Sequence, residues 1–245
     1  MSVKIGHASQ DENKRIKGGS AGDQTGGEVC IRSWYGKNWN VLLRPKYPDI
    51  AERSAQACEK GCANQYIGYD QNERNTLHRE AQKAGYNLAK ITEPCETDCS
   101  AFMTICAIAG GAKNLEYTGN APTTSTMAKA FLKTGLYELI KDPKYLTSDR
   151  YLKRGDILVA EGKHTVMVLS DGSSASTPVM LKLGNRGEDV LRLQKALNAI
   201  GYNLEEDGDF GSQTLAAVRH FQAVNGLEVD GIVGEQTRKA VGLTQ

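Results

Sequence analysis

Long hydrophobic runs are missing from this chain of 245 residues, and so is an excess of charge of either sign. No apolar stretch approaches the roughly 20 residues that span a bilayer, so no membrane insertion is expected. The 30 basic and 29 acidic residues leave a formal net charge of +1, which gives no electrostatic reason to expect nucleic acid as a partner. The length suits a medium-sized domain followed by a smaller one, each with its own core.

A secretory signal is also missing. The N-terminus, MSVKIGHASQDENK, has neither a basic start nor an apolar core, so we expect a product made and kept in the cytosol. The polar, glycine-rich segment that follows gives little structural signal. Residues 3–5 and 14–17 are predicted to form two short strands around a turn at 9–13.

Cysteine is sparse. The six cysteines could pair, but a cytosolic chain of this size does not need disulfides, and most are expected to be reduced. The Cys-x3-Cys pairs at 58/62 and 95/99 lack the Cys-x2-Cys spacing of a zinc ribbon, so no metal and no cofactor are predicted. Cys58 and Cys62 continue the apolar face of a predicted helix and are expected in the core.

Cys99 lies at a position that favours a reactive thiolate. Cys99 precedes an apolar helix whose buried face is predicted at Phe102, Ile105, Cys106 and Ala109. At a helix N-terminus, unpaired N–H groups and the helix dipole favour thiolate over thiol and lower the cysteine pKa. Cys99 is therefore a candidate nucleophile. Because most cysteines are buried small hydrophobes, this assignment requires a partner base.

The candidate base is His164. Residues 155–160 and 164–169 form two apolar runs around Glu161-Gly162-Lys163, a pattern typical of a hairpin. Period-two alternation puts His164 on the same face as Val166, at the start of a buried strand. A lone histidine in such a position is more often structural. His78, on a predicted helix over 76–84, is expected to be solvated.

A second domain is predicted after the small, polar segment 173–178, which has the composition of a flexible linker. An Asp-Gly turn followed by a Thr-bearing helix start occurs at 207–218 and returns at 230–241, an offset of 23 residues. Together with a predicted helix over 190–200, the repeat indicates a compact three-helix module.

This module resembles a known family. The patterns Leu183-Gly184-x-x-Gly187-x-x-Val190 and Asp207-Gly208-x-Phe210-Gly211 are similar to the peptidoglycan-binding domain type 1. The resemblance is assigned to residues 179–245. It implies a small all-α domain that holds an enzyme on bacterial peptidoglycan, the expected partner of this chain.

The Cys99 segment also resembles a family. Asp98-Cys99-Ser100-Ala101-Phe102 is similar to the Asp-Cys-Ser-Gly-Phe box of NlpC/P60 cysteine peptidases and the related CHAP amidases, with Ala101 in place of glycine. The Gly155-Asp156 and His164-x-Val166 segments are similar to two of their strands. The resemblance implies an α+β, papain-like domain over residues 1–172. In it Cys99 would attack an amide carbonyl and His164 would transfer the proton. Asp98, Ser100 and the upstream Tyr69 would bind substrate.

The third catalytic residue, which orients the imidazole, departs from the family pattern. After the His164 strand only Ser170-Asp171-Gly172 remains, and Asp171 would lie some ~20 Å from His164 at the rise of a strand. The segment Ile5-Gly6-His7-Ala8-Ser9 resembles the family strand that carries this residue. We expect His7, which requires the N-terminal strand to replace the last strand of the family.

The two resemblances together imply a phage or prophage endolysin. Such a peptidoglycan hydrolase would be made in the bacterial cytoplasm without a signal peptide and act on the wall after release, cutting stem-peptide amide bonds with a thiol. A D-glutamyl endopeptidase is expected if Asp98 pairs with a free stem-peptide amine, but Asp98 could instead cap the helix. The alternatives are an N-acetylmuramoyl-L-alanine amidase with the same site and an inactive wall-binding protein.

Overall fold

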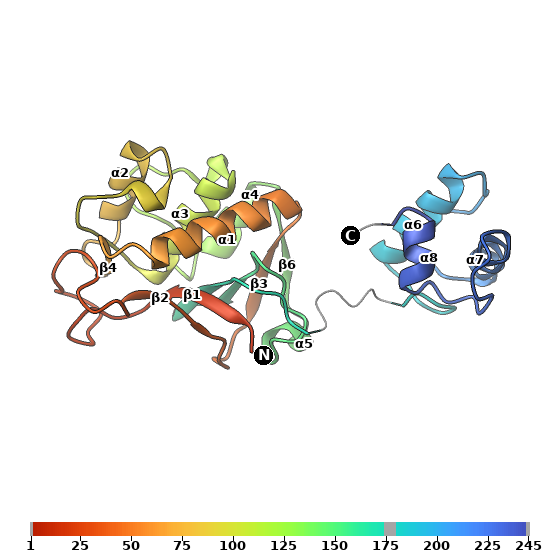
Figure 1. The fold of residues 1–245 in the computed structure, drawn as a ribbon, viewed down its shortest axis with the longest axis horizontal. Coiled ribbons are helices and arrows are strands. Elements are labelled where there is room, and N and C mark those ends of the chain that lie inside the picture. Colours follow the sequence, from red (N-terminus) through yellow and green to blue (C-terminus); the bar gives the residue numbers. More distant parts are fainter. Residues whose placement is uncertain (1, 174–179, 244–245) are drawn as a thin grey trace. The chain divides into compact units, whose positions relative to one another are not determined.

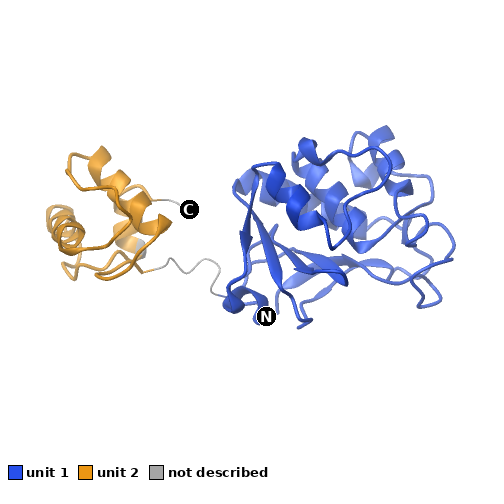
Figure 2. Cartoon of the chain, turned by 180° about the vertical axis from the view of Figure 1, so that it is seen from behind, with its two compact units in different colours: residues 1–176 blue, residues 177–245 orange. Residues whose placement is uncertain are grey.

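The computed structural model describes residues 2–173 and 180–243. The chain divides into two compact units, Met1–Ser176 and Thr177–Gln245 (Figure 2). The predicted linker, 173–178, falls mainly on residues outside the described part. No helix within the described ranges combines the length and the apolar character needed to cross a membrane.

The N-terminal unit is built on a six-stranded sheet with the strand order β2-β1-β8-β7-β3-β6. Its strands are β1 (Lys4–Ala8), β2 (Val29–Ser33), β3 (Val41–Pro45), β6 (Tyr137–Ile140), β7 (Ile157–Ala160) and β8 (His164–Val168). All neighbouring pairs run antiparallel. The hairpin predicted from the sequence is confirmed as β7 and β8, with Ala160 opposite His164.

The N-terminal strand β1 lies between β2 and β8 in this sheet. It pairs with β8 through Ile5↔Val168 and Gly6↔Met167, and with β2 along all five of its residues. The strand that carries His7 is therefore the direct neighbour of the strand that carries His164. This is the rearranged order that the choice of His7 requires.

The prediction of a strand at 14–17 is wrong, because residues 9–28 form a loop between β1 and β2. Buried carboxylates hold the backbone of this loop. Asp23 accepts hydrogen bonds from five consecutive backbone N–H groups, those of residues 25–29. Asp70 accepts from Gly18 and Gly19. These side-chain bonds satisfy the donors that a strand ladder would otherwise use.

Helices cover one face of the sheet (Figure 1). They are α1 (Pro48–Cys62), α2 (Thr76–Lys83), α3 (Cys99–Gly110) and α4 (Met127–Lys133), with 3-10 turns η1 (Leu88–Lys90) and η2 (Lys113–Leu115). The short α5 (Pro143–Leu146) lies on the other face, where Leu146 packs with Leu42 and Leu158 (Figure 1). A separate two-stranded parallel sheet joins β4 (Ile67–Tyr69) and β5 (Cys95–Thr97). β5 leads directly into α3.

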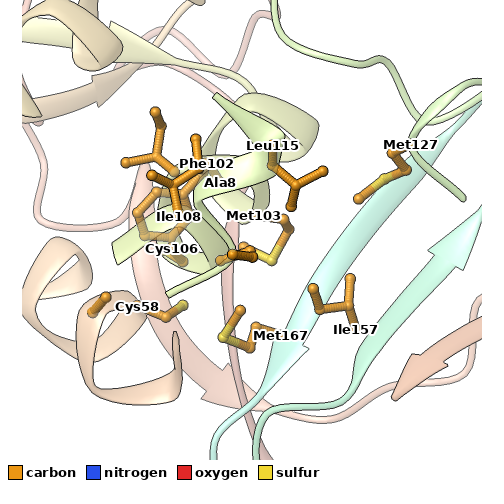
Figure 3. Close-up of a cluster of buried hydrophobic side chains, with 14 of the residues drawn as sticks. Ala8, Cys58, Phe102, Met103, Cys106, Ile108, Leu115, Met127, Ile157 and Met167 are labelled. Atoms are coloured by element: carbon orange, nitrogen blue, oxygen red, sulfur yellow. The ribbon is translucent and has the colours of Figure 1, made fainter. Parts of the chain in front are cut away.

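Helix α3 is the centre of the main core. Every residue from Cys99 to Ile108 is buried, so the prediction of a single buried face was too narrow, and Ala109, predicted to be buried, is only half-buried. A helix that is apolar on all sides belongs inside a domain. Figure 3 shows Phe102, Met103 and Cys106 of α3 gathered with Cys58 of α1 and Met167 of β8.

Close contact between α1 and α3 depends on a small residue. A Cβ atom at Gly61 would lie 2.6 Å from the Phe102 ring, so any larger residue there would push the helices apart. Cys58 is buried in this core and Cys62 is half-buried, and all six cysteines are free thiols. A second apolar cluster includes Val3, Ile5 and Trp39.

The C-terminal unit contains three helices among its described residues. They are α6 (Glu188–Ala199), α7 (Ser212–Val224) and α8 (Glu235–Ala240). Their core is built from Leu181, Val190, Leu193, Leu197, Phe210, Ala217, Val218, Phe221, Val233 and Val241. The helical C-terminal module expected from the sequence is thus present.

The two copies of the internal repeat share one pattern of hydrogen bonds, made in each by a buried glutamine side chain. Gln194 donates to the Asp207 carboxylate (2.8 Å) and accepts from the Gly208 backbone N–H (2.9 Å). In the second copy, Gln222 donates to Asp230 (2.8 Å) and accepts from the Gly231 N–H (2.8 Å). Both glutamine side chains are almost fully buried. Each copy fastens an Asp-Gly turn to a helix.

Replacing Gln222 with methionine is expected to lower the free energy of unfolding of this unit by about 2 kcal/mol, because the buried Gly231 N–H loses its acceptor. Gln213→Met is the matched control, since Gln213 lies exposed on the same helix. Thermal unfolding of the full chain, followed at the C-terminal transition, measures the difference. Equal midpoints for the two variants would show that the Gln222 hydrogen bonds do not contribute to the stability of this unit.

Candidate active site

Cys99 is the first residue of α3, and Asp98 is the residue that caps the helix. The Asp98 carboxylate accepts a hydrogen bond from the backbone N–H of Ala101 (2.7 Å) and another from the Ser100 hydroxyl (3.0 Å). The backbone of Asp98 is extended, as at an N-cap. The predicted position of Cys99 at a helix N-terminus is confirmed. Its side chain is buried, with the residue 6% exposed.

Arg74 holds this helix start and was missed by the sequence analysis. Its guanidinium forms an ion pair with Asp98 (2.6 Å) and donates to the Ser100 hydroxyl (2.9 Å). It also donates to the backbone carbonyls of Ala121 and Pro122. Both Asp98 oxygens are therefore engaged within the protein. No sequence signal connects Arg74 to an aspartate 24 positions later.

The His164 and His7 imidazoles lie together on neighbouring strands. Their ring centroids are 5.7 Å apart in an edge-to-face arrangement. Trp39 stacks beside His164 at 6.2 Å, and Tyr35 lies 6.3 Å from His7. The sequence analysis did not connect Tyr35 and Trp39 with the site. Both belong to the segment between β2 and β3, and the Trp39 indole N–H donates to the Tyr35 carbonyl (3.1 Å).

Cys99 meets the His164 strand through its backbone. The registered β1–β8 pairs are Ile5↔Val168 and Gly6↔Met167, so the ladder ends before Thr165. The backbone N–H of Thr165, the residue after His164, interacts with the Cys99 sulfur. No hydrogen bond joins the Cys99 thiol to the His164 imidazole, both of which lie in the described part of the chain.

Two tyrosines complete the surroundings of the thiol. Burial raises the pKa of Tyr69, and the charge of a Cys99 thiolate raises it further. Burial also raises the pKa of Tyr35, with Arg32 lowering it and the Cys99 thiolate raising it. Tyr69, whose hydroxyl accepts a hydrogen bond from Gln71 (3.2 Å), therefore lies within electrostatic range of the Cys99 sulfur.

Burial controls the protonation of the site. It raises the pKa of Cys99 to about 12, an effect that Asp98 reinforces and the N–H groups of Thr165 and Ser100 oppose. Burial, followed by the charge of Lys37, lowers the pKa of His164 to about 3. The prediction of a lowered cysteine pKa is therefore wrong for the free protein, because desolvation outweighs the helix terminus. At neutral pH the site holds a thiol and a neutral imidazole.

Two other candidates take structural roles. Asp171 follows the far end of β8, where its carboxylate accepts from the Arg154 backbone N–H (2.8 Å). His78 is buried rather than solvated, which corrects the prediction, because its ring stacks on Tyr117 at 4.1 Å and bonds the Tyr86 hydroxyl. Within residues 2–173 and 180–243, no three His, Cys, Asp or Glu side chains are grouped to hold a metal ion.

The neutral histidines make stability depend on pH. Burial, then Arg32 and Lys37, lower the pKa of His7 to about 4, against about 6.5 for an unfolded histidine. Because the unfolded chain then binds more protons, the free energy of unfolding falls as the pH decreases from 6.5 towards 4. We expect the protonation of His7 in the unfolded chain to lower the free energy of unfolding by about 1 kcal/mol when the pH falls from about 7 to about 5.5.

Denaturant unfolding of wild type and His7→Gln at both pH values measures this contribution. The variant should lose about 1 kcal/mol less stability than wild type on acidification. Glu96, whose pKa burial raises to about 8, titrates in both proteins and cancels in the comparison. An identical loss in the two proteins would contradict a neutral, buried His7.

Residues 5–175 match the family described as Endolysin-like domain, and the chain belongs to it. Residues 186–241 match the Putative peptidoglycan binding domain.

Curated relatives share shorter stretches. A probable N-acetylmuramoyl-L-alanine amidase of Bacillus licheniformis is 35% identical over 112 residues, which are 43% of this chain and 30% of the relative. The N-acetylmuramoyl-L-alanine amidase CwlL of the same organism is 38% identical over 108 residues, or 42% and 29%. A spore cortex-lytic enzyme of Halalkalibacterium halodurans is 39% identical over 75 residues, or 30% and 23%. The chain thus spans less than a third of the length of these relatives.

Two solved structures are similar over a quarter of the chain. The crystal structure of a Burkholderia AP3 phage endolysin has 46% identity and a TM-score of 0.25, covering 26% of this chain and 24% of that one. The SleB N-terminal domain has 40% identity and a TM-score of 0.26, covering 26% of this chain and 89% of that one.

Proposed function

We propose that this protein is a peptidoglycan hydrolase that cleaves an amide bond of the bacterial wall, with Cys99 as nucleophile and His164 as general base. One observation carries the proposal. In a chain of the endolysin-like family, a buried cysteine at a helix N-terminus meets the strand of His164, and a second imidazole lies beside the first. These features support a thiol site of the kind that the NlpC/P60 resemblance implies.

The proposed reaction begins from neutral groups. As the Cys99 sulfur attacks the amide carbonyl, its proton passes to His164, whose unprotonated imidazole is ready to accept it. Backbone N–H groups at the start of α3 stabilise the oxyanion. His164 then returns the proton to the leaving amine, and water hydrolyses the thioester. Catalytic hydrogen bonds that are absent in a free enzyme often form only with substrate.

His7 is the proposed third residue. It contacts the His164 ring edge-on, and its own Nδ1 is buried without a hydrogen-bond partner. A buried, unpaired nitrogen costs free energy, and such groups are retained at functional sites. In this role His7 restricts the orientation of the His164 ring while the proton moves.

The proposed bond is the one between N-acetylmuramic acid and L-alanine. The D-glutamyl endopeptidase expectation rested on an Asp98 carboxylate free to pair with an amine. Arg74, Ser100 and the helix N–H already engage that carboxylate, which supports a positioning role instead. The names of two relatives support the amidase. Asp98, Ser100 and Tyr69 are proposed to shape the substrate cleft around Cys99, and the C-terminal module to hold the enzyme on peptidoglycan.

Mass spectrometry of the fragments released from purified peptidoglycan tests the proposal. An amidase releases peptides with a new L-alanine N-terminus and leaves the glycan strands intact. Peptides that instead end in a free D-glutamyl γ-carboxyl would identify the endopeptidase. Cys106→Ala is the matched control, because Cys106 is a core thiol of the same helix. If the wild-type protein releases no fragment, the chain is a wall-binding protein without hydrolase activity.

A further inference from the structure

A groove of about 470 Å³ opens beside His7. Its walls come from the end of β1, the loop over residues 9–28 and strand β2, and they include Asp11, Glu12, Lys14 and Arg32. Because His7 both lines this groove and contacts His164, a substrate chain that leaves the catalytic centre on this side enters the groove.

Arg32 is the cation of this groove nearest to the aromatic wall of the site. Its guanidinium carbon lies 4.9 Å from the centroid of the Tyr35 ring, and Tyr35 lies 6.3 Å from His7. Stacking on a ring fixes the plane of a guanidinium and leaves its edge N–H donors available. Among the described residues no carboxylate lies within ion-pair distance of Arg32.

Each acid of the groove uses one carboxylate oxygen to bond the loop, and its second oxygen has no hydrogen-bond partner. One Asp11 oxygen accepts from the backbone N–H groups of Asn13 and Arg15, and one Glu12 oxygen accepts from the Ser20 N–H. The charge of Arg32 instead reaches the catalytic groups. Together with Lys37 it lowers the pKa values of His7 and His164, although burial is the larger cause for both.

We propose that Arg32 binds a carboxylate of the peptidoglycan stem peptide and selects substrates in which that group is free rather than amidated. This inference rests on the proposed function and adds a specificity-determining residue to it. A guanidinium held in one plane matches a carboxylate through two parallel hydrogen bonds, and an amide offers only one acceptor. Stem peptides offer such a group at the α-carboxyl of D-glutamate, or at a diamino acid in the third position.

The test compares rates on soluble muramoyl tripeptides. One pair differs in a free or amidated D-glutamyl α-carboxyl, and a second pair carries lysine or diaminopimelate at the third position. Wild type is expected to prefer the free α-acid in kcat/KM by about tenfold to a hundredfold, as for a charge-assisted hydrogen bond. In Arg32→Gln this ratio should fall to about one, and Arg32→Lys should restore part of it.

Lys129→Gln is the matched control, because Lys129 is an exposed cation on α4 and should keep the wild-type ratio. If wild type instead prefers diaminopimelate over lysine at the third position, and Arg32→Gln loses that preference, the carboxylate that Arg32 binds is that of diaminopimelate. A wild-type preference that survives in Arg32→Gln would overturn the proposal, and so would a wild type without preference in either pair. Circular dichroism confirms that each variant is folded.

Failure of the subsite can be separated from failure of the proposed function. Calorimetric binding of the free and amidated tripeptides to the Cys99→Ala protein needs no catalysis. Tighter binding of the free acid, lost in Cys99→Ala/Arg32→Gln, supports the subsite even if the chain cuts no bond. If both peptides bind equally well and wild type still hydrolyses peptidoglycan, the Arg32 subsite is excluded and the proposed hydrolase function is retained.

Discussion

Replacing Cys99 with alanine is expected to lower the rate of peptidoglycan hydrolysis by at least about a thousandfold, because the proposed nucleophile is lost and no second thiol can take its place. The other five cysteines serve as core or strand residues, and none begins a helix. The loss should appear as an absent decrease in turbidity of purified walls. Cys99→Ser should behave in the same way, since a buried serine is a much weaker nucleophile.

The control separates chemistry from stability. Cys99→Ala scarcely changes the packed volume, so its thermal midpoint should remain close to that of wild type. Cys106→Ala should instead keep its activity and lose about 1 kcal/mol of stability, because it removes a buried contact in the main core. Wall lysis by Cys99→Ala at the wild-type rate would exclude the thiol mechanism.

Slow alkylation of Cys99 in the free protein would not argue against its role. Burial gives this thiol a pKa of about 12, so little thiolate exists before substrate arrives. The sequence could place Cys99 at a helix N-terminus, because the apolar helix and its Asp98 cap are encoded locally. It could not give the sign of the pKa shift, which depends on how many segments cover the sulfur.

Local patterns predicted much of the fold. The β7–β8 hairpin follows from two alternating runs around a turn, and the C-terminal helices follow from their apolar spacing. The 23-residue repeat predicted two similar turns, but not that Gln194 and Gln222 hold them. The burial of a glutamine cannot be predicted until its hydrogen-bond partners are known, since glutamine is common on helix surfaces.

The missed parts of the site are long-range. Arg74 reaches Asp98 and the carbonyls of Ala121 and Pro122, and nothing in the sequence links these three segments. The sequence predicts a hairpin in place of the loop over residues 9–28, because the carboxylates that hold its backbone, Asp23 within the loop and Asp70 after β4, look like ordinary turn residues. Nothing in the sequence connects Tyr35 and Trp39 with the two histidines that they contact.

His164→Ala is expected to be nearly as damaging as Cys99→Ala, because a neutral thiol needs a base at the moment of attack. Residues that act as one unit show losses that do not add, so the double variant should be little slower than either single variant. Initial rates on purified walls, with protein concentrations adjusted over about a thousandfold, resolve these differences. A double variant slower than both by the product of their effects would show that the two residues act separately.

The third position gives a graded result. His7→Ala should lower kcat by roughly tenfold to a hundredfold, since it removes the ring that lies 5.7 Å from His164 and leaves the general base in place. Asp171→Ala is the matched control, because Asp171 bonds the backbone N–H of Arg154 beyond the far end of the same strand. It should change stability rather than kcat. Equal and negligible effects of both substitutions would mean that neither residue orients His164. Asp23 and Asp70 would not be simple substitutes, because the backbone of the 9–28 loop already uses their carboxylates.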